Sequence, residues 1–298
     1  MGRFAPILII IAASLWGIDG IVLRPSLYNL PVPLVVLIES AIVAIFLSPI
    51  FLKQFPKIMA LDRKDLFSFF LVALFGGAIG TMSITKALFY VNFVNLSVVI
   101  LIQKLQPVFA LILASMLLKE KLRKEFFIWA GSAIFGAYLM TFGLSIPNLS
   151  TGDKTAIAAG LSLIAAFSFG SSTVLSKRAL RNVGFELGTY LRFLFASVIM
   201  LVIALSFGDI VHVESVSLKQ WSIFFLIAFT TGCAAIFLYY YGLKKVTASV
   251  ATICELAFPL TAVILEYFLR GNILDVIQWV GVIILIISII KVSYINNH

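Results

Sequence analysis

The chain has 298 residues, of which 62% are hydrophobic and 12% are charged, with a mean hydropathy of +1.12. A soluble domain of this size needs many more polar side chains to cover its surface, so the composition excludes a soluble globular protein. The formal net charge is +9, but the 22 basic residues are spread between apolar segments. Because they form no continuous basic stripe, a nucleic-acid partner is excluded as well.

Apolar runs of about 20 residues recur along the whole chain. A helix rises about 1.5 Å per residue and the hydrocarbon core of a bilayer is about 30 Å thick, so each run can cross a membrane. The runs lack the period-2 alternation of a membrane β-barrel, and unpaired backbone groups are costly in lipid. The sequence predicts an all-α integral membrane protein with ten spans, at residues 4–23, 31–52, 66–89, 95–118, 125–142, 155–176, 185–207, 218–241, 247–269 and 273–294.

Basic residues are distributed unevenly between the segments that connect these spans. With the N-terminus inside, the inner segments hold fifteen Lys and Arg residues, whereas the outer segments hold five, Arg24 among them. The positive-inside rule then places both termini in the cytoplasm. We expect a multi-pass cell-membrane protein, in the inner membrane of a bacterium.

The first half of the chain resembles the second half. Residues 12–17 align with residues 165–170, and residues 71–74 align with residues 226–229. Each half holds five spans, an odd number, so the second half starts on the opposite side of the membrane and is inverted. Inverted repeats are a recurrent plan of transporters, with the substrate site near the midplane between the halves. We therefore expect two five-helix repeats around a central cavity, at residues 4–142 and 155–294.

Several short patterns stand at corresponding places of the two halves or at the ends of spans. They are Trp16-Gly17, Phe169-Gly170, Arg192-Phe193, the mid-helix prolines Pro107 and Pro259, and Leu118-Lys119-Glu120. In this order the chain resembles the EamA-type branch of the drug/metabolite transporter superfamily. The resemblance implies ten spans built from two five-helix units, with spans five and ten peripheral to a cavity. It also implies a secondary carrier of small metabolites, often an exporter of amino acids or related compounds.

Five ionisable side chains lie well inside the predicted spans: Asp19, Glu39, Lys104, Arg192 and Glu255. Each costs roughly 2.5 to 3.5 kcal/mol at a helix centre on insertion scales, so each needs a partner, water or a function. The expected ion pairs are Lys104 with Asp19 or Glu39, and Arg192 with Glu255. Two interpretations stay open, namely static pairs that fix the bundle and charges that line or gate a cavity.

Polar residues surround the two mid-span prolines. Thr252 and Glu255 are three residues apart and share a helical face, which Pro259 continues. Gln103 precedes Pro107, and a proline kink frees backbone carbonyls that can bind a ligand or a cation. Simple helix curvature is the alternative explanation of both prolines.

Three further features concern aromatic and hydroxyl side chains. Trp16 lies one turn before Asp19 and could cover an aromatic or cationic ligand. Ser172 corresponds to Asp19 in the second half, although serines also serve close helix packing. The run Tyr239-Tyr240-Tyr241 is typical of interfacial anchors, with at most one or two rings turned inward.

Enzymatic signatures are missing from the sequence. Cys233 and Cys254 lack the spacing of metal ligands, and neither His212 nor His298 lies inside a span. No nucleotide-binding or intramembrane protease motif is present. We therefore expect no enzyme activity, no metal and no cofactor.

Together these features predict a secondary transporter that works by alternating access. The expected substrate is a small polar or amphipathic metabolite, amino-acid-like, with export favoured over import. A coupling proton and a second copy of the chain are possible partners beside the lipid bilayer. The alternative is a flippase for a lipid-linked carrier with the same fold. The candidate substrate- or proton-binding residues are Trp16, Asp19, Glu39, Gln103, Lys104, Ser172, Arg192, Thr252 and Glu255, with Pro107 and Pro259 as helix kinks.

Overall fold

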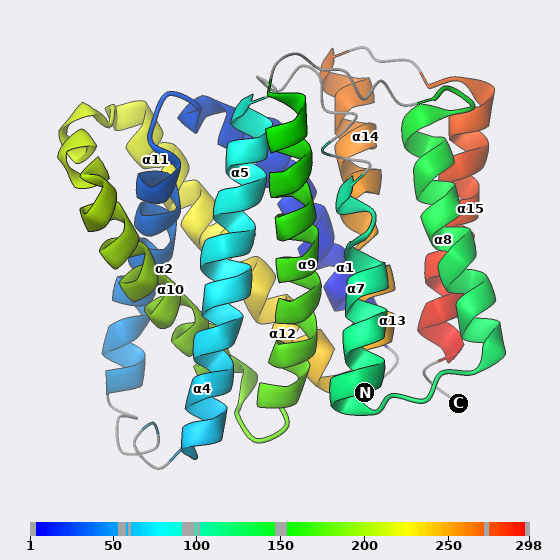
Figure 1. The fold of residues 1–298 in the computed structure, drawn as a ribbon, viewed down its shortest axis with the longest axis horizontal. Helices are drawn as coiled ribbons and strands as arrows, with labels where there is room; N and C mark the ends of the chain where they lie inside the picture. Colours follow the sequence, from blue (N-terminus) through cyan, green and yellow to red (C-terminus); the bar gives the residue numbers. More distant parts are fainter. Residues whose placement is uncertain are drawn as a thin grey trace.

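A computed structural model describes residues 4–52, 58, 61–90, 99, 102–146, 154–270 and 274–295. Within these ranges the chain is a bundle of helices without strands (Figure 1). The helices are α1 Ala5–Ile18, α2 Val32–Leu52, α4 Arg63–Val72, α5 Gly80–Tyr90, α7 Gln106–Leu113, α8 Lys124–Phe142, α9 Thr155–Ala179, α10 Phe185–Phe207, α11 Leu218–Ile227, α12 Ala235–Lys245, α13 Ala248–Cys254, α14 Ala257–Arg270 and α15 Val276–Ile295.

Nine helices of the described chain are long and apolar enough to cross a membrane. They correspond to nine of the ten predicted spans, which confirms the all-α multi-pass fold. The remaining span is represented by the shorter apolar helix Gln106–Leu118. Most of its predicted first part, residues 95–101, falls outside the described residues.

Two π-helical segments stand at matching places in the two halves. Ala73–Ile79 joins α4 to α5, and Ala228–Ala234 joins α11 to α12, 155 residues further along. A π-helical segment is an uncommon local widening of a helix. Its presence at the same point of spans three and eight supports the internal repeat.

The helices α8 and α15 pack against each other at one edge of the bundle (Figure 1). Their backbones meet at Gly136 and Gly281, where an added Cβ would clash with the backbone of the other helix. Small residues at such crossings allow close helix contact. This pair corresponds to spans five and ten, and its place is the peripheral one implied by the family resemblance.

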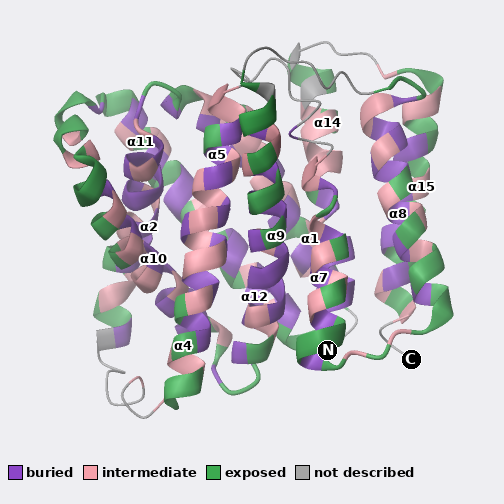
Figure 2. Ribbon diagram, in the orientation of Figure 1, coloured by how far each residue is buried: buried purple, intermediate pink, exposed green. Residues whose placement is uncertain are grey.

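Both ends of the described chain lie at the same end of the bundle, where α1 begins and α15 ends (Figure 1). We call this the N/C end and the opposite end the distal end. Large apolar side chains fill the interior near the N/C end, including the fully buried Ile9, Phe69, Leu180 and Leu243. Outer faces of the helices carry exposed apolar residues, as expected for contact with lipid (Figure 2).

Hydrogen bonds to helix ends also close the N/C end. The Glu120 carboxylate accepts from the backbone N–H groups of Ala248 and Ser249 at 2.8 and 3.1 Å and from the Ser249 hydroxyl at 2.6 Å. It therefore satisfies free N–H groups in the first turn of α13. The Lys177 ammonium donates to the carbonyls of Leu243 and Lys244 at the end of α12, at 2.9 and 3.1 Å. Glu120 thus holds the start of α13, and Lys177 of α9 holds the end of α12, at the N/C end.

Candidate functional site

A cavity of about 880 Å³ lies inside the bundle, a volume within the usual range of small-molecule sites. α1 begins at the N/C end, and the lining residues Trp16, in its last turn, and Asp19, directly after it, follow about three to four turns later. α2 begins at the distal end, and its lining residues Val36 and Glu39 stand in its first two turns. The cavity therefore occupies the middle and the distal half of these helices, whereas the N/C end is packed shut.

The cavity wall contains every residue that the sequence singled out as a candidate. These are Trp16, Asp19, Glu39, Gln103, Lys104, Ser172, Arg192, Thr252, Glu255, Pro107 and Pro259. The structure thus brings together side chains from six predicted spans. Their roles toward a ligand stay predictions.

Asp19 and Glu39 share one arginine, Arg24. The Arg24 guanidinium lies 2.6 Å from the Asp19 carboxylate and 3.3 Å from the Glu39 carboxylate, and all three side chains are nearly buried. Arg24 also donates to the Thr85 hydroxyl at 3.5 Å. The prediction that Lys104 pairs with Asp19 or Glu39 is therefore wrong, because Arg24 takes both carboxylates.

A π-helical turn explains why Arg24 reaches Asp19. The segment Asp19–Leu23 is π-helical, and the backbone N–H of Arg24 donates to the carbonyl of Asp19. This five-residue step places residues 19 and 24 on the same side, whereas an α-helix would separate them by about 140°. Arg24 is the first residue after the predicted span 4–23, so the charge count assigned it to the outer loop. It is instead a buried part of the cavity wall.

Lys104 stands at a break between two helices. Gln103 is helical, Lys104 and Leu105 form a turn, and α7 begins at Gln106 with Pro107 in its first turn. The Lys104 ammonium is buried and has no hydrogen-bond partner in the described structure. An unpaired buried charge is expensive, so this lysine indicates a site that a ligand or water completes.

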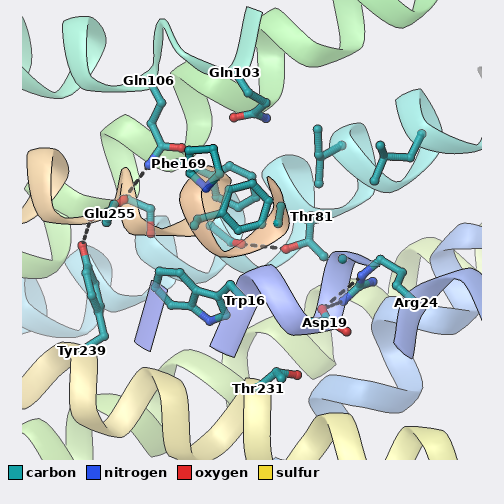
Figure 3. Close-up of a pocket in the computed structure, with 18 of the residues that line it drawn as sticks. Trp16, Asp19, Arg24, Thr81, Gln103, Gln106, Phe169, Thr231, Tyr239 and Glu255 are labelled. Carbon is teal, nitrogen blue, oxygen red and sulfur yellow. Dashed lines mark hydrogen bonds and ion pairs between the residues drawn. The ribbon is translucent and has the colours of Figure 1, made fainter. Parts of the chain in front are cut away.

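Glu255 occupies the corresponding break in span nine, between α13 and α14. Its carboxylate accepts from the Tyr239 hydroxyl at 2.6 Å, from the Gln106 amide at 2.6 Å and from the Thr173 hydroxyl at 3.1 Å. The partners come from α12, α7 and α9, so Glu255 joins helices of both halves (Figure 3). Pro259 follows four residues later, and because it has no N–H, the Glu255 carbonyl bonds to the N–H of Phe258 instead.

Arg192 does not form the predicted ion pair with Glu255. Its guanidinium donates to the Ser172 hydroxyl and the Tyr240 hydroxyl, both at 3.3 Å, and lies 6.0 Å from the centre of the Tyr240 ring. Ser172 therefore holds Arg192 at the cavity wall. The neutral partners leave the arginine charge uncompensated by any carboxylate within 4 Å among the described residues.

The tyrosine run turns two rings inward, the largest number that was predicted, and only the third is left for an interfacial role. Tyr239 and Tyr240 are buried and bind Glu255 and Arg192, so they are not interfacial anchors. Tyr241 instead lies under the Lys245 ammonium, 3.7 Å from its ring centre. A helix turns about 100° per residue, so two neighbours can face inward while the third faces out. Of the functional candidates, sequence reasoning missed Arg24, Thr173 and Tyr239.

Aromatic side chains form one wall of the cavity. The Trp16 and Tyr239 rings pack with centroids 5.3 Å apart and planes inclined by 58°. Phe169 and Phe258 also line the cavity, and Figure 3 shows Trp16 and Phe169 between the Glu255 side and the Asp19–Arg24 side. The site therefore combines a broad apolar surface with charged groups at its margins, which suits an amphipathic ligand with a flat ring.

Comparison with known families agrees with this arrangement. The model of the EamA-like transporter family matches residues 3–142 and again residues 156–294. The chain belongs to the EamA-like transporter family. This confirms the resemblance to the drug/metabolite transporter superfamily, and it makes the chain a transporter and not an enzyme.

Individual relatives extend the comparison. The chain is 48% identical over 294 residues to a Fusobacterium nucleatum protein named riboflavin transporter ImpX, covering 97% of each chain. It is 28% identical over 250 residues to an uncharacterized Synechocystis transporter, sll1164, covering 82% of this chain and 70% of the relative. The crystal structure of another protein aligns with this chain at a TM-score of 0.74, and the alignment covers 98% of this chain and 97% of that protein's chain. At 14% identity, that structure supports the fold alone.

Proposed function

We propose that the chain carries riboflavin or a close flavin relative across the cytoplasmic membrane of a bacterium. The observation that carries this proposal is the 48% identity to a riboflavin transporter over almost the whole length of both chains. Such coverage includes all the cavity-lining segments. The expectation of an amino-acid-like substrate gives way to a flavin in this proposal.

The cavity chemistry supports a flavin. Riboflavin joins a flat tricyclic ring, with a polar dioxopyrimidine edge, to a ribityl chain with four hydroxyl groups. The aromatic wall of Trp16 and Phe169 offers apolar surface for the ring, and the charged groups around it offer hydrogen bonds for both polar ends. An amino acid would leave most of this wall without contact.

We further propose that the two five-helix units, residues 4–142 and 155–294, rock about the cavity to expose it alternately to each side. Closure at the N/C end and lining residues toward the distal end support an outward-facing state, with both termini in the cytoplasm. Export stays a prediction, since a carrier cycle can run in either direction and the gradient sets the net flux. The coupling proton also stays a prediction, with Glu255 as its proposed carrier.

The direct test uses the purified full chain in proteoliposomes preloaded with unlabelled riboflavin. We expect saturable uptake of external labelled riboflavin, because counterflow needs only a carrier and no coupling ion. Empty liposomes supply the background. A thermal-shift series with riboflavin, amino acids and polyprenyl phosphate runs in parallel, since a ligand that binds the folded state stabilises it.

Each result has a clear meaning. Saturable counterflow together with a riboflavin-dependent shift supports the proposal. Stabilisation by polyprenyl phosphate alone would instead support the lipid-carrier flippase. Absence of riboflavin counterflow, together with amino-acid stabilisation, would overturn the flavin proposal and favour the amino-acid-like substrate.

A further inference from the structure

Polar atoms without partners are concentrated in the cavity. Six buried side-chain nitrogen or oxygen atoms of the described residues have no hydrogen-bond partner. Five of them belong to residues that line the cavity, and the sixth belongs to Ser288 on the peripheral helix α15. The five are Asp19 Oδ1, Glu39 Oε1, Gln103 Nε2, Lys104 Nζ and Thr252 Oγ1. Buried polar groups are nearly always paired, so these atoms indicate where a bound molecule supplies hydrogen bonds.

The unpaired atoms differ in kind between two parts of the wall. Asp19 and Glu39 are held by Arg24 through one oxygen each, and the second oxygen of each carboxylate is an unused acceptor. Gln103 and Lys104, at the break before α7, present unused N–H donors. Figure 3 shows Gln103 on one side of the pocket, above Phe169, and the Asp19–Arg24 pair on the other side, next to Trp16. One part of the cavity wall therefore offers hydrogen-bond acceptors and the other part offers hydrogen-bond donors.

Resting on the proposed function, we infer that a flavin binds this cavity in one orientation. Its dioxopyrimidine carbonyls accept from Gln103 and Lys104, and its ribityl hydroxyls donate to the carboxylates of Asp19 and Glu39. The ring then lies along Trp16, whose indole is held by Tyr239. Asp19 and Glu39 thereby become the residues that determine specificity for the ribityl end.

Donor and acceptor counts favour this orientation over its reverse. Each ribityl hydroxyl brings a proton that a carboxylate can accept, whereas the dioxopyrimidine edge has two carbonyl acceptors and only one N–H donor. The reversed ligand would place carbonyl oxygens against carboxylates and leave the donors of Gln103 and Lys104 with hydroxyl groups alone. A mismatch of acceptor with acceptor in a buried site weakens binding.

The orientation predicts that the site rejects a phosphorylated ribityl chain. Flavin mononucleotide carries a phosphate at the end of the ribityl group, with a charge of about −1.5 to −2 near neutral pH. That charge would approach the Asp19 and Glu39 carboxylates, which share the single positive charge of Arg24. Lumiflavin keeps the ring but has a methyl group in place of the ribityl chain, so it would lose the hydrogen bonds to both carboxylates.

The experiment measures equilibrium binding to the purified full chain by quenching of flavin fluorescence. We expect riboflavin to bind at least about tenfold more tightly than flavin mononucleotide and than lumiflavin, a difference of about 1.4 kcal/mol. In Glu39→Gln the preference for riboflavin over flavin mononucleotide narrows, because one repelling charge is gone. Glu120→Gln makes the same chemical change at the N/C end, outside the cavity lining, and should leave the ratio at its wild-type value.

The ligand series separates the two proposals. If the protein binds riboflavin, flavin mononucleotide and lumiflavin with equal affinity, the proposed orientation is overturned and the proposed function stands. Failure to bind any flavin overturns the proposed function itself. If Glu39→Gln does not fold, the three ligands on the unmodified chain still decide the orientation. If it folds and its ratio is unchanged, the carboxylates do not set the specificity.

Discussion

The N/C end and the cavity use polar side chains in opposite ways. At the N/C end, Glu120 and Lys177 bind the free backbone groups of α13 and α12, so these charged atoms are paired within the protein. In the cavity, Lys104 is buried without a partner, and the Asp19 and Glu39 carboxylates are each paired through one oxygen. The difference indicates that one region is built for closure and the other for a ligand.

This contrast carries a thermodynamic consequence. Pairing at helix ends adds to the stability of the folded chain, whereas unpaired groups in the cavity reduce it until a ligand or water arrives. A binding site that is costly when empty is a common trade between stability and function. Substitutions in the two regions should therefore separate stability from transport.

The largest effect is expected for Glu255→Gln. Its carboxylate collects hydrogen bonds from Tyr239, Thr173 and Gln106, on helices of both halves. An amide has one acceptor oxygen, so at least one of these bonds to a charged group is lost, at a cost of about 1.5 to 3 kcal/mol. We expect riboflavin counterflow to fall roughly 10- to 100-fold, measured as initial rate at equal amounts of reconstituted protein.

Glu125→Gln is the matched control for this change, because Glu125 is exposed in the first turn of α8. Its counterflow should stay at the wild-type rate. A wild-type rate in Glu255→Gln would remove Glu255 from the transport mechanism and return it to a static role in the bundle.

The next effect concerns the closed end. Glu120→Ala removes the acceptor of two backbone N–H groups and one hydroxyl at the start of α13. Loss of such a cap typically costs about 1 to 2 kcal/mol, so the free energy of unfolding should fall by that amount. Thermal unfolding of the purified chain measures the change. Glu186→Ala, an exposed carboxylate at the same end, should change stability by less than about 0.5 kcal/mol, and equal losses in the two variants would contradict a specific cap.

The sequence was sufficient for the fold and for most of the charged residues in the cavity wall. Long apolar runs identify membrane helices because lipid forbids unpaired backbone, and interior charges stand out because each is costly there. The same reasoning selected Asp19, Glu39, Lys104, Arg192 and Glu255, all of which line the cavity. The expectation that these residues line a cavity needs only their depth in the membrane, which the spans define.

Pairing inside the cavity could not be predicted in the same way. Arg24 reaches Asp19 only because the intervening turn is π-helical, and the sequence carries no simple signal for that widening. Tyr239 faces inward because of the rotation of α12 about its axis, which three consecutive tyrosines leave undefined. The depth of a residue in the membrane follows from hydropathy, but the direction in which its side chain points and the partners that it binds follow from tertiary packing.

The smallest effect compares two lysines replaced by methionine. Lys104→Met removes an unpaired buried ammonium and keeps an unbranched apolar chain of similar length, so the empty protein should become more stable by about 1 kcal/mol. Lys177→Met removes an ammonium that donates to two carbonyls of α12, so stability should fall by about 1 kcal/mol. Thermal unfolding without ligand measures both, and riboflavin binding should weaken in Lys104→Met alone. A loss of stability in both variants would mean that Lys104 is paired in the membrane. The Lys104 ammonium would then be no different from that of Lys177, and the distinction between a closing region and a binding region would fail.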